Sequence, residues 1–222
     1  MVPAMTGKFL LYGGQGTGAV AIEAALTLAG QAYELVDIPD ARTLARKLPQ
    51  MRQVPLLVFP DGEQMTESAA ILMRLAELIP DARLAPGPAD PRRGQYLRWM
   101  SFVSSQIYAH YWLKDDPSRL VPDASLHIQV SRRIEARILD CWAFMERGLA
   151  AQLGPGRAFL LGDAPGVLDL YVCVVSRFRP RRRRFYAVAP QMGEAVKALD
   201  ADPRLKRLWD ERYPFFDGWE DD

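Results

Sequence analysis

The first third of the chain switches repeatedly between the hydrophobic patterns of strands and of helices. Lys8–Tyr12 is a short apolar run, and Tyr33–Asp37 alternates with the period of two that is typical of a strand. Between them, Gly18–Ala29 carries small and aliphatic residues at helical spacing, and Gly30 suits the end of that helix. These patterns predict a strand, a helix and a second strand.

The next residues predict a helix, a hairpin and another helix. Ala41–Leu48 suits a short helix, with Asp40 as its N-cap. The sequence "PDG" is a hairpin turn signal, and it is flanked by the segments Leu56–Phe59 and Glu63–Thr66. Ser68–Ile79 then carries apolar residues at helical spacing. The predicted order of this region is therefore β-α-β-α-β-β-α, with a mixed four-stranded sheet.

Prolines separate this region from one of different character. Pro80–Pro91 holds four prolines in twelve residues, and we predict a linker there because proline cannot continue a helix. After it, no run predicts a strand. Helical patterns cover Arg92–Leu113, Ser125–Leu153, Gly166–Arg177, Gln191–Leu199 and Pro203–Arg212. We therefore predict an α/β domain over 1–79, a linker over 80–91 and an all-helical domain over 92–222.

Composition and charge narrow the classes of function. The chain has 28 Lys and Arg against 27 Asp and Glu, so its net charge does not favour nucleic acid or a membrane as a general partner. No apolar run has the length of a membrane span. Cys141 and Cys173 lie far apart in apolar helical runs, which predicts buried reduced thiols and a cytoplasmic location. The two histidines, His110 and His127, have no cysteines nearby, so we expect no metal site.

The glycine-rich turn after the first predicted strand fits a nucleotide-binding fingerprint. Gly14, Gly16 and Ala19 match G-x-G-x-x-A, and Asp37 follows about 20 residues later. A dinucleotide fold, however, needs further parallel βαβ units. The predicted hairpin makes the third and fourth strands antiparallel, so the sheet is too small for the two halves of that site. We therefore expect Asp37 to be an ordinary polar strand end.

Two residue pairs and the order of elements resemble the cytosolic glutathione transferase family, in particular its bacterial members. Val54-Pro55 opens the third predicted strand, and Glu67-Ser68 opens the third predicted helix. The resemblance spans nearly the whole chain. It implies a thioredoxin-like domain followed by a helical domain, a cis proline, glutathione as co-substrate, a small electrophilic and apolar substrate, and a homodimer.

The chemistry of glutathione fits these residues. The resemblance implies that Val54, beside Pro55, pairs through its backbone with the cysteinyl part of the tripeptide. Ser68 begins a helix, where free amides and the dipole favour the γ-glutamyl carboxylate, and Glu67 suits the ammonium group. Gln53 is either a contact for the glycyl end or an exposed loop residue. The alternative is purely structural, with Pro55 as a turn and Ser68 as a cap.

The residues that activate the thiol depart from the family pattern. Gly13, Gly18 and Ala19 stand where bacterial members have tyrosine, cysteine and serine. Thr17 alone keeps a hydroxyl in this loop, so it is the candidate catalytic residue, donating to the glutathione thiolate. Two alternatives remain open: Thr17 is only a cap, or the amides of residues 16–19 stabilise the thiolate.

The second region offers an acceptor pocket and a basic run. Tyr108, Tyr111 and Trp112 lie in an aromatic-rich helix and either line a pocket for an apolar or aromatic electrophile or pack against neighbouring helices. Arg177–Tyr186 has six arginines within eight residues. We expect a solvated loop there, and an anionic partner is the alternative.

The predicted function of the chain is that of a glutathione transferase. The alternative is a non-catalytic binding protein on the same fold.

Overall fold

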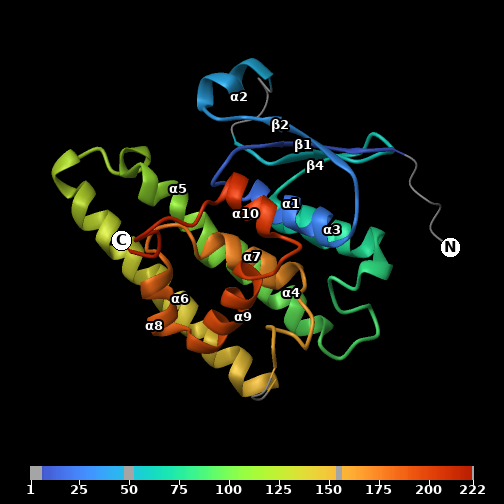
Figure 1. Ribbon diagram of the computed structural model, residues 1–222. Coiled ribbons are helices and arrows are strands. Elements are labelled where there is room, and N and C mark those ends of the chain that lie inside the picture. Colours follow the sequence, from blue (N-terminus) through green and yellow to red (C-terminus); the bar gives the residue numbers. More distant parts are fainter. Residues whose placement is uncertain (1–6, 48–52, 154–156, 222) are drawn as a thin grey trace.

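A mixed sheet and a set of helices form two layers in the computed structural model, which describes residues 7–47, 53–153 and 157–221 (Figure 1). The sheet has the strand order β2-β1-β3-β4. Its strands are β1 (Phe9–Gly13), β2 (Tyr33–Asp37), β3 (Leu56–Val58) and β4 (Gln64–Thr66). β1 runs parallel to β2, while β3 is antiparallel to both β1 and β4. This pairing confirms the predicted hairpin and the mixed four-stranded sheet.

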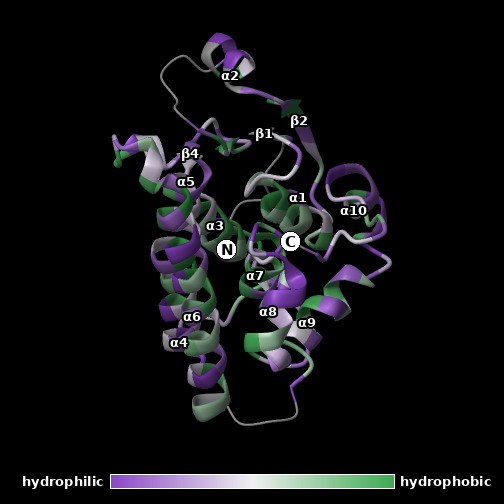
Figure 2. Ribbon diagram, turned by 90° about the vertical axis from the view of Figure 1, so that its left-hand side faces the viewer, coloured by the Kyte–Doolittle hydropathy of each residue, from purple (hydrophilic) through white to green (hydrophobic). Residues whose placement is uncertain are grey.

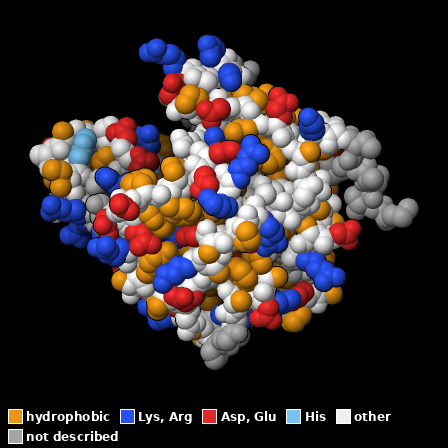
Figure 3. Space-filling model, in the orientation of Figure 1, with side chains coloured by type: hydrophobic (Ala, Val, Ile, Leu, Met, Phe, Trp, Pro, Cys, Tyr) orange, Lys and Arg blue, Asp and Glu red, His pale blue; other side chains and the backbone are white. Residues whose placement is uncertain are grey.

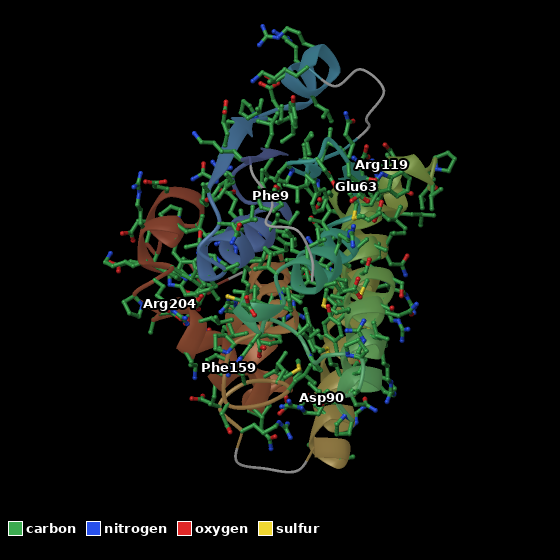
Figure 4. All side chains as sticks on the ribbon, turned by 90° about the vertical axis from the view of Figure 1, so that its right-hand side faces the viewer. Phe9, Glu63, Asp90, Arg119, Phe159 and Arg204 are labelled. Carbon is green, nitrogen blue, oxygen red and sulfur yellow. The ribbon has the colours of Figure 1, made fainter. Side chains whose placement is uncertain are left out.

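Three helices accompany the sheet. α1 (Ala19–Leu28) and α3 (Ser68–Leu78) lie against one face, and α2 (Ala41–Lys47) lies beyond the other (Figure 1). The alternation along β1 turns Phe9 and Leu11 into the core between the sheet and these helices, where Phe9 packs edge-on against Phe59. Phe9 is labelled in Figure 4. Leu48, the predicted last residue of α2, lies outside the described residues.

From residue 67 onward, the described residues contain helices and no strand. The helices are α4 (Arg93–Phe102), the π-helix η2 (Val103–Tyr108), α5 (Ala109–Asp115), α6 (His127–Leu153), α7 (Val167–Val175), α8 (Arg182–Val188), α9 (Pro190–Asp200) and α10 (Lys206–Arg212), with short 3-10 turns at Pro80–Ala82, Pro117–Arg119 and Ala124–Leu126. The predicted fold class, a thioredoxin-like α/β part followed by an all-helical part, is confirmed. The domain boundaries at residues 79 and 92 stay a prediction.

Helix α7 joins the two parts. All nine of its residues are buried, and it packs against α1, α3, α4 and α9. Figure 2 shows it at the centre of the molecule, with the hydrophilic α8 beside it. Asp169 in its first turn accepts hydrogen bonds from the amides of Leu160 (2.7 Å) and Gly166 (2.9 Å). Asp169 thus caps the start of α7.

Two predictions about the helical part were wrong in detail. The helix expected over Arg92–Leu113 is interrupted by η2, a π-helical segment of the kind that often occurs at functional sites. The run Arg177–Tyr186 is not simply a solvated loop, because α8 begins within it and the Arg182 side chain is fully buried. Arg182 forms an ion pair with Asp200 at 2.8 Å.

Within the part of the chain that the structure describes, none of the helices combines the length and hydropathy needed to cross a bilayer.

Candidate functional site

A cavity of about 950 Å³ opens between the thioredoxin-like part and the helices that follow it. It is bounded by the start of α1, the α2 side of the sheet, the start of α3, the η2–α5 region and the segment after α7. Figure 3 shows a notch in the molecular outline between α2 and the end of α5. Every site residue predicted from the sequence lines this cavity: Thr17, Gln53, Val54, Pro55, Glu67, Ser68, Tyr108, Tyr111 and Trp112.

The sheet side of the cavity carries the two motif pairs. The Val54–Pro55 peptide bond is cis, as the resemblance implied, and Pro55 is buried while Gln53 is exposed. Glu67 has φ 66° and ψ 101°, a backbone conformation that non-glycine residues rarely adopt and that concentrates at functional sites. Ser68 is buried at the first position of α3, and its hydroxyl donates to the Tyr171 hydroxyl at 3.3 Å.

The hydroxyl of Thr17 is engaged within its own turn. It donates to the carbonyl oxygen of Gly14 at 2.8 Å and accepts from the amide of Ala19 at 3.3 Å. The amide of Thr17 also donates to Gly14, at 3.3 Å. Because one hydroxyl carries a single hydrogen, Thr17 in this geometry has none left for a ligand. The structure therefore matches the cap alternative for Thr17 rather than the catalytic one.

Tyr108 reaches from η2 to the start of α1. The amide of Gly18 donates to the Tyr108 hydroxyl at 3.0 Å. A Cβ atom on Gly18 would lie 2.6 Å from that oxygen, so only glycine at this position allows the approach. Burial raises the pKa of Tyr108 well above its usual range, which keeps the hydroxyl protonated. Among the described residues, no acceptor takes its hydrogen.

Position 13 also has no room for a side chain. A Cβ atom there would lie 2.4 Å from the Cβ of Ala19. The end of β1 therefore approaches the first turn of α1 too closely for a side chain at position 13 while Ala19 keeps this place.

Aromatic rings form the wall opposite the sheet. The Phe178 ring lies 5.4 Å from that of Tyr108 and 5.2 Å from that of Tyr111, measured between centroids. Tyr111 is almost completely buried, so it packs in the core as well as lining the cavity. Trp112 lies at the rim with half of its surface exposed, under the guanidinium of Arg119. Arg119 is labelled in Figure 4, at the turn that follows α5.

Comparisons with known proteins agree with this architecture. Residues 20–83 match the family model described as Glutathione S-transferase, N-terminal domain. The uncharacterized GST-like protein YncG of Escherichia coli (strain K12) is 27% identical over 204 residues, which cover 89% of this chain and 95% of that protein. The probable glutathione S-transferase BZ2 of Zea mays is 32% identical over 160 residues, covering 66% of this chain and 63% of that protein.

Solved structures resemble the whole fold. A glutathione transferase homolog from Sulfitobacter, solved with bound glutathione, has a TM-score of 0.76 at 22% identity, covering 93% of this chain and 99% of that one. The glutathione S-transferase from Xylella fastidiosa also has a TM-score of 0.76, at 18% identity, covering 92% of this chain and 98% of that one. The chain therefore resembles the glutathione S-transferase family along most of its length, and residues 20–83 match the N-terminal domain of that family.

Several lining residues were not singled out in the sequence as parts of the cavity. Tyr171 carries a hydroxyl within α7, whose residues are otherwise apolar apart from Asp169, and this was the available signal. The others are cationic and come from the end of α5 and the segment around the start of α8: Lys114, Arg119, Arg177, Arg179 and Arg181. The arginine run was noticed in the sequence, but its position at the cavity depends on how α7 and α8 pack.

Neither a metal cluster nor a reactive cysteine occurs at the cavity as far as the structure describes it. No group of three or more His, Cys, Asp or Glu side chains is close enough to hold a metal among residues 7–47, 53–153 and 157–221. Cys141 and Cys173 are free and buried, and neither lines the cavity. Burial raises the pKa of Cys173 to about 12, so its thiol stays neutral.

Proposed function

We propose that this protein binds glutathione in the cavity and presents its thiolate to a small electrophilic substrate. The observation that carries the proposal is that Val54-Pro55, Glu67-Ser68 and Tyr108 all line one cavity of about 950 Å³. The volume falls within the range of small-molecule sites. The Sulfitobacter homolog of the same fold is described with bound glutathione, which supports the same ligand here.

The sheet side of the cavity suits the tripeptide. Ser68 opens the 11-residue helix α3, whose first amides and dipole favour a carboxylate. The exposed carboxylate of Glu67 beside it favours the γ-glutamyl ammonium. Val54 offers backbone groups to the cysteinyl part, and the exposed Gln53 can reach the glycyl end.

We assign the stabilisation of the thiolate to Tyr108. A free thiol has a pKa near ~8.5, so little of it is ionised at neutral pH without help. The Gly18 amide fixes the position of the Tyr108 oxygen and leaves its hydrogen available. A hydrogen bond from this hydroxyl to the sulfur lowers the pKa of the bound thiol. Tyr108 thus takes the role that the sequence suggested for Thr17.

The second candidate function is glutathione binding without catalysis. It is favoured by the internal use of Thr17 and of the amides of Thr17, Gly18 and Ala19, each of which already has a partner within the protein. A titration of the bound thiol separates the two candidates, because only the catalytic one lowers its pKa.

Ser68→Ala tests the binding site. The Ser68 hydroxyl donates to Tyr171 over a long 3.3 Å, and we propose that it turns to the γ-glutamyl carboxylate when glutathione binds. Because the substitution removes this donor, we expect glutathione affinity to fall by about 1–3 kcal/mol in calorimetry. Ser105→Ala is the matched control, because Ser105 also lines the cavity but donates to the carbonyl of Ser101. Equal affinities in the unmodified protein and in Ser68→Ala would remove Ser68 from the site.

We further propose a cytoplasmic homodimer. Free, buried cysteines are typical of a reducing compartment.

A further inference from the structure

The aromatic side of the cavity contains a cation that is held in place but not neutralised. The Arg177 guanidinium lies 4.5 Å from the ring centroid of Tyr213, 4.6 Å from that of Phe215 and 4.5 Å from that of Trp219. All three rings belong to the last residues of the chain. Cation–π contacts of this kind orient a guanidinium without supplying a negative charge.

Buried Arg182 and partly buried Arg212 differ from the partly buried Arg177 in their partners. Arg182 is paired with Asp200, and Arg212 is paired with Glu23 at 3.0 Å. Arg177 forms no ion pair with any described residue, and its Nη1 is buried without a hydrogen-bond partner. Burial of this kind lowers the pKa of Arg177. Arg177 lines the cavity, so a ligand bound there can supply the negative charge that the described residues do not.

The surroundings of Arg177 are cationic and aromatic at once. Phe178, next in the chain, packs on the rings of Tyr108 and Tyr111. Arg179 and Arg181 line the same cavity. Two further lining cations are already matched by carboxylates outside the lining, Lys114 by Glu135 and Arg119 by Asp116. Arg177 therefore adjoins the aromatic wall without a carboxylate partner among the described residues.

We propose that the acceptor half of the cavity binds an aromatic anion, a ring carrying a carboxylate or sulfonate, and that Arg177 binds its charged group. This rests on the proposed function for the other half of the cavity, where glutathione is assigned to the sheet side. Phe178 and Tyr108 stack on the ring, and the part of the Arg177 guanidinium that borders the cavity pairs with the anionic oxygens. The predicted acceptor is thus revised from apolar to aromatic and anionic.

A matched pair of fluorescent probes tests the charge preference. 8-Anilinonaphthalene-1-sulfonate and N-phenyl-1-naphthylamine share the same rings, and only the first carries a sulfonate. Binding is followed by fluorescence with and without glutathione. We expect the sulfonate to bind more tightly, and Arg177→Gln to weaken it about tenfold while the neutral probe is unaffected, because one charge-assisted contact is lost. Arg177→Lys, which keeps the charge, restores part of the affinity.

Two variants serve as controls. Arg207→Gln removes an exposed arginine that is paired with Glu211, far from the cavity lining, and leaves both probes unchanged. Phe178→Ala weakens both probes, because it removes their common ring contact. If both probes ignore Phe178→Ala, or if Arg177→Gln affects them equally, the proposal is overturned.

Calorimetry with glutathione separates this proposal from the proposed function. Arg177→Gln is expected to bind glutathione like the unmodified protein. A loss of glutathione binding with unchanged sulfonate affinity would reassign Arg177 to glutathione and overturn the proposal. If the unmodified protein does not bind glutathione, the proposed function fails, while the difference between the two probes still decides the role of Arg177.

Discussion

The hydrogen bond between Gly18 and Tyr108 links two residues that lie 90 positions apart. The space beside Gly18 is filled by the Tyr108 hydroxyl, so a side chain at position 18 and this hydroxyl exclude each other. The absence of a reactive side chain at position 18 is therefore not simply a loss. It allows a hydroxyl from the helical part to reach the start of α1, where a thiolate is also favoured by the helix dipole.

Tyr108→Phe tests whether the Tyr108 hydroxyl activates the glutathione thiol in place of a side chain at position 18. Removing the donor destabilises the thiolate, so we expect the pKa of bound glutathione to rise by about 1–2 units, the equivalent of about 1.5–3 kcal/mol for a hydrogen bond to a charged group. The measurement is the ultraviolet absorbance of the thiolate in the complex as a function of pH. Glutathione affinity should change much less.

Thr17→Val is the matched control for that titration. Its hydroxyl already donates to Gly14, so its removal should leave the pKa of the thiol nearly unchanged and cost only turn stability. A shift in Thr17→Val with none in Tyr108→Phe would return the activating role to Thr17. A bound thiol that titrates near its free value in the unmodified protein would favour the non-catalytic alternative.

At the scale of elements, local patterns and long-range packing explain different parts of the structure. The order of strands, the hairpin and helices α1, α3, α7 and α9 followed from apolar periodicity and turn signals, which are local. The start of α8 did not, because a run of arginines shows no apolar face. The buried Arg182 side chain forms an ion pair with Asp200 of α9, and this partner compensates its charge. A contact between two helices cannot be predicted from the local sequence pattern.

The residues of the candidate site also fall into those that local motifs predict and those that only tertiary packing brings together. Val54-Pro55 and Glu67-Ser68 are short motifs with fixed spacing, so the sequence identified them. The contact of Tyr108 with Gly18 depends on how η2 packs against α1, and the aromatic surroundings of Arg177 depend on the return of the chain end. Both arise from tertiary packing, and the sequence therefore placed Tyr108 only among the pocket residues and left Arg177 in a loop.

Helix α7 depends on a single buried carboxylate. Asp169 accepts from two backbone amides, and although burial raises the pKa of Asp169 to about 6, both donors favour its ionised form. We expect Asp169→Ala to lower the free energy of unfolding by about 2–5 kcal/mol, because two buried N–H groups lose their acceptor. Chemical denaturation measures this.

Asp163→Ala is the control for that experiment. Asp163 is an exposed carboxylate in the same segment, and its removal should change stability by less than about 0.5 kcal/mol. Similar effects of the two substitutions would show that the α7 cap does not depend on Asp169.

At the scale of the whole molecule, the two parts are joined by packing and by charge. α1 packs against α7 and α10, and Arg212 of α10 forms ion pairs with Glu23 of α1 at 3.0 Å and Asp37 of β2 at 3.4 Å. Asp37, which the sequence pattern placed in a nucleotide fingerprint, thus ties the sheet to the last helix.

The outer face of the helical part leads to a prediction about assembly. Phe144 of α6 is 45% exposed, and its ring lies 5.4 Å from that of Phe102 of α4. Exposed aromatic clusters mark interaction surfaces, and the family resemblance implies a homodimer in which the first domain of one subunit packs on the helical domain of the other. We expect sedimentation at roughly 50 kDa, twice the 25.0 kDa of one chain, at micromolar concentration.

Two substitutions locate the contact between the subunits. Phe144→Asp places a charge in this contact and should shift the protein toward 25.0 kDa, while Phe216→Asp, at another exposed phenylalanine near the chain end, should not. A single 25.0 kDa species of the unmodified protein would refute the dimer, and a dimer indifferent to Phe144→Asp would move the interface to another face.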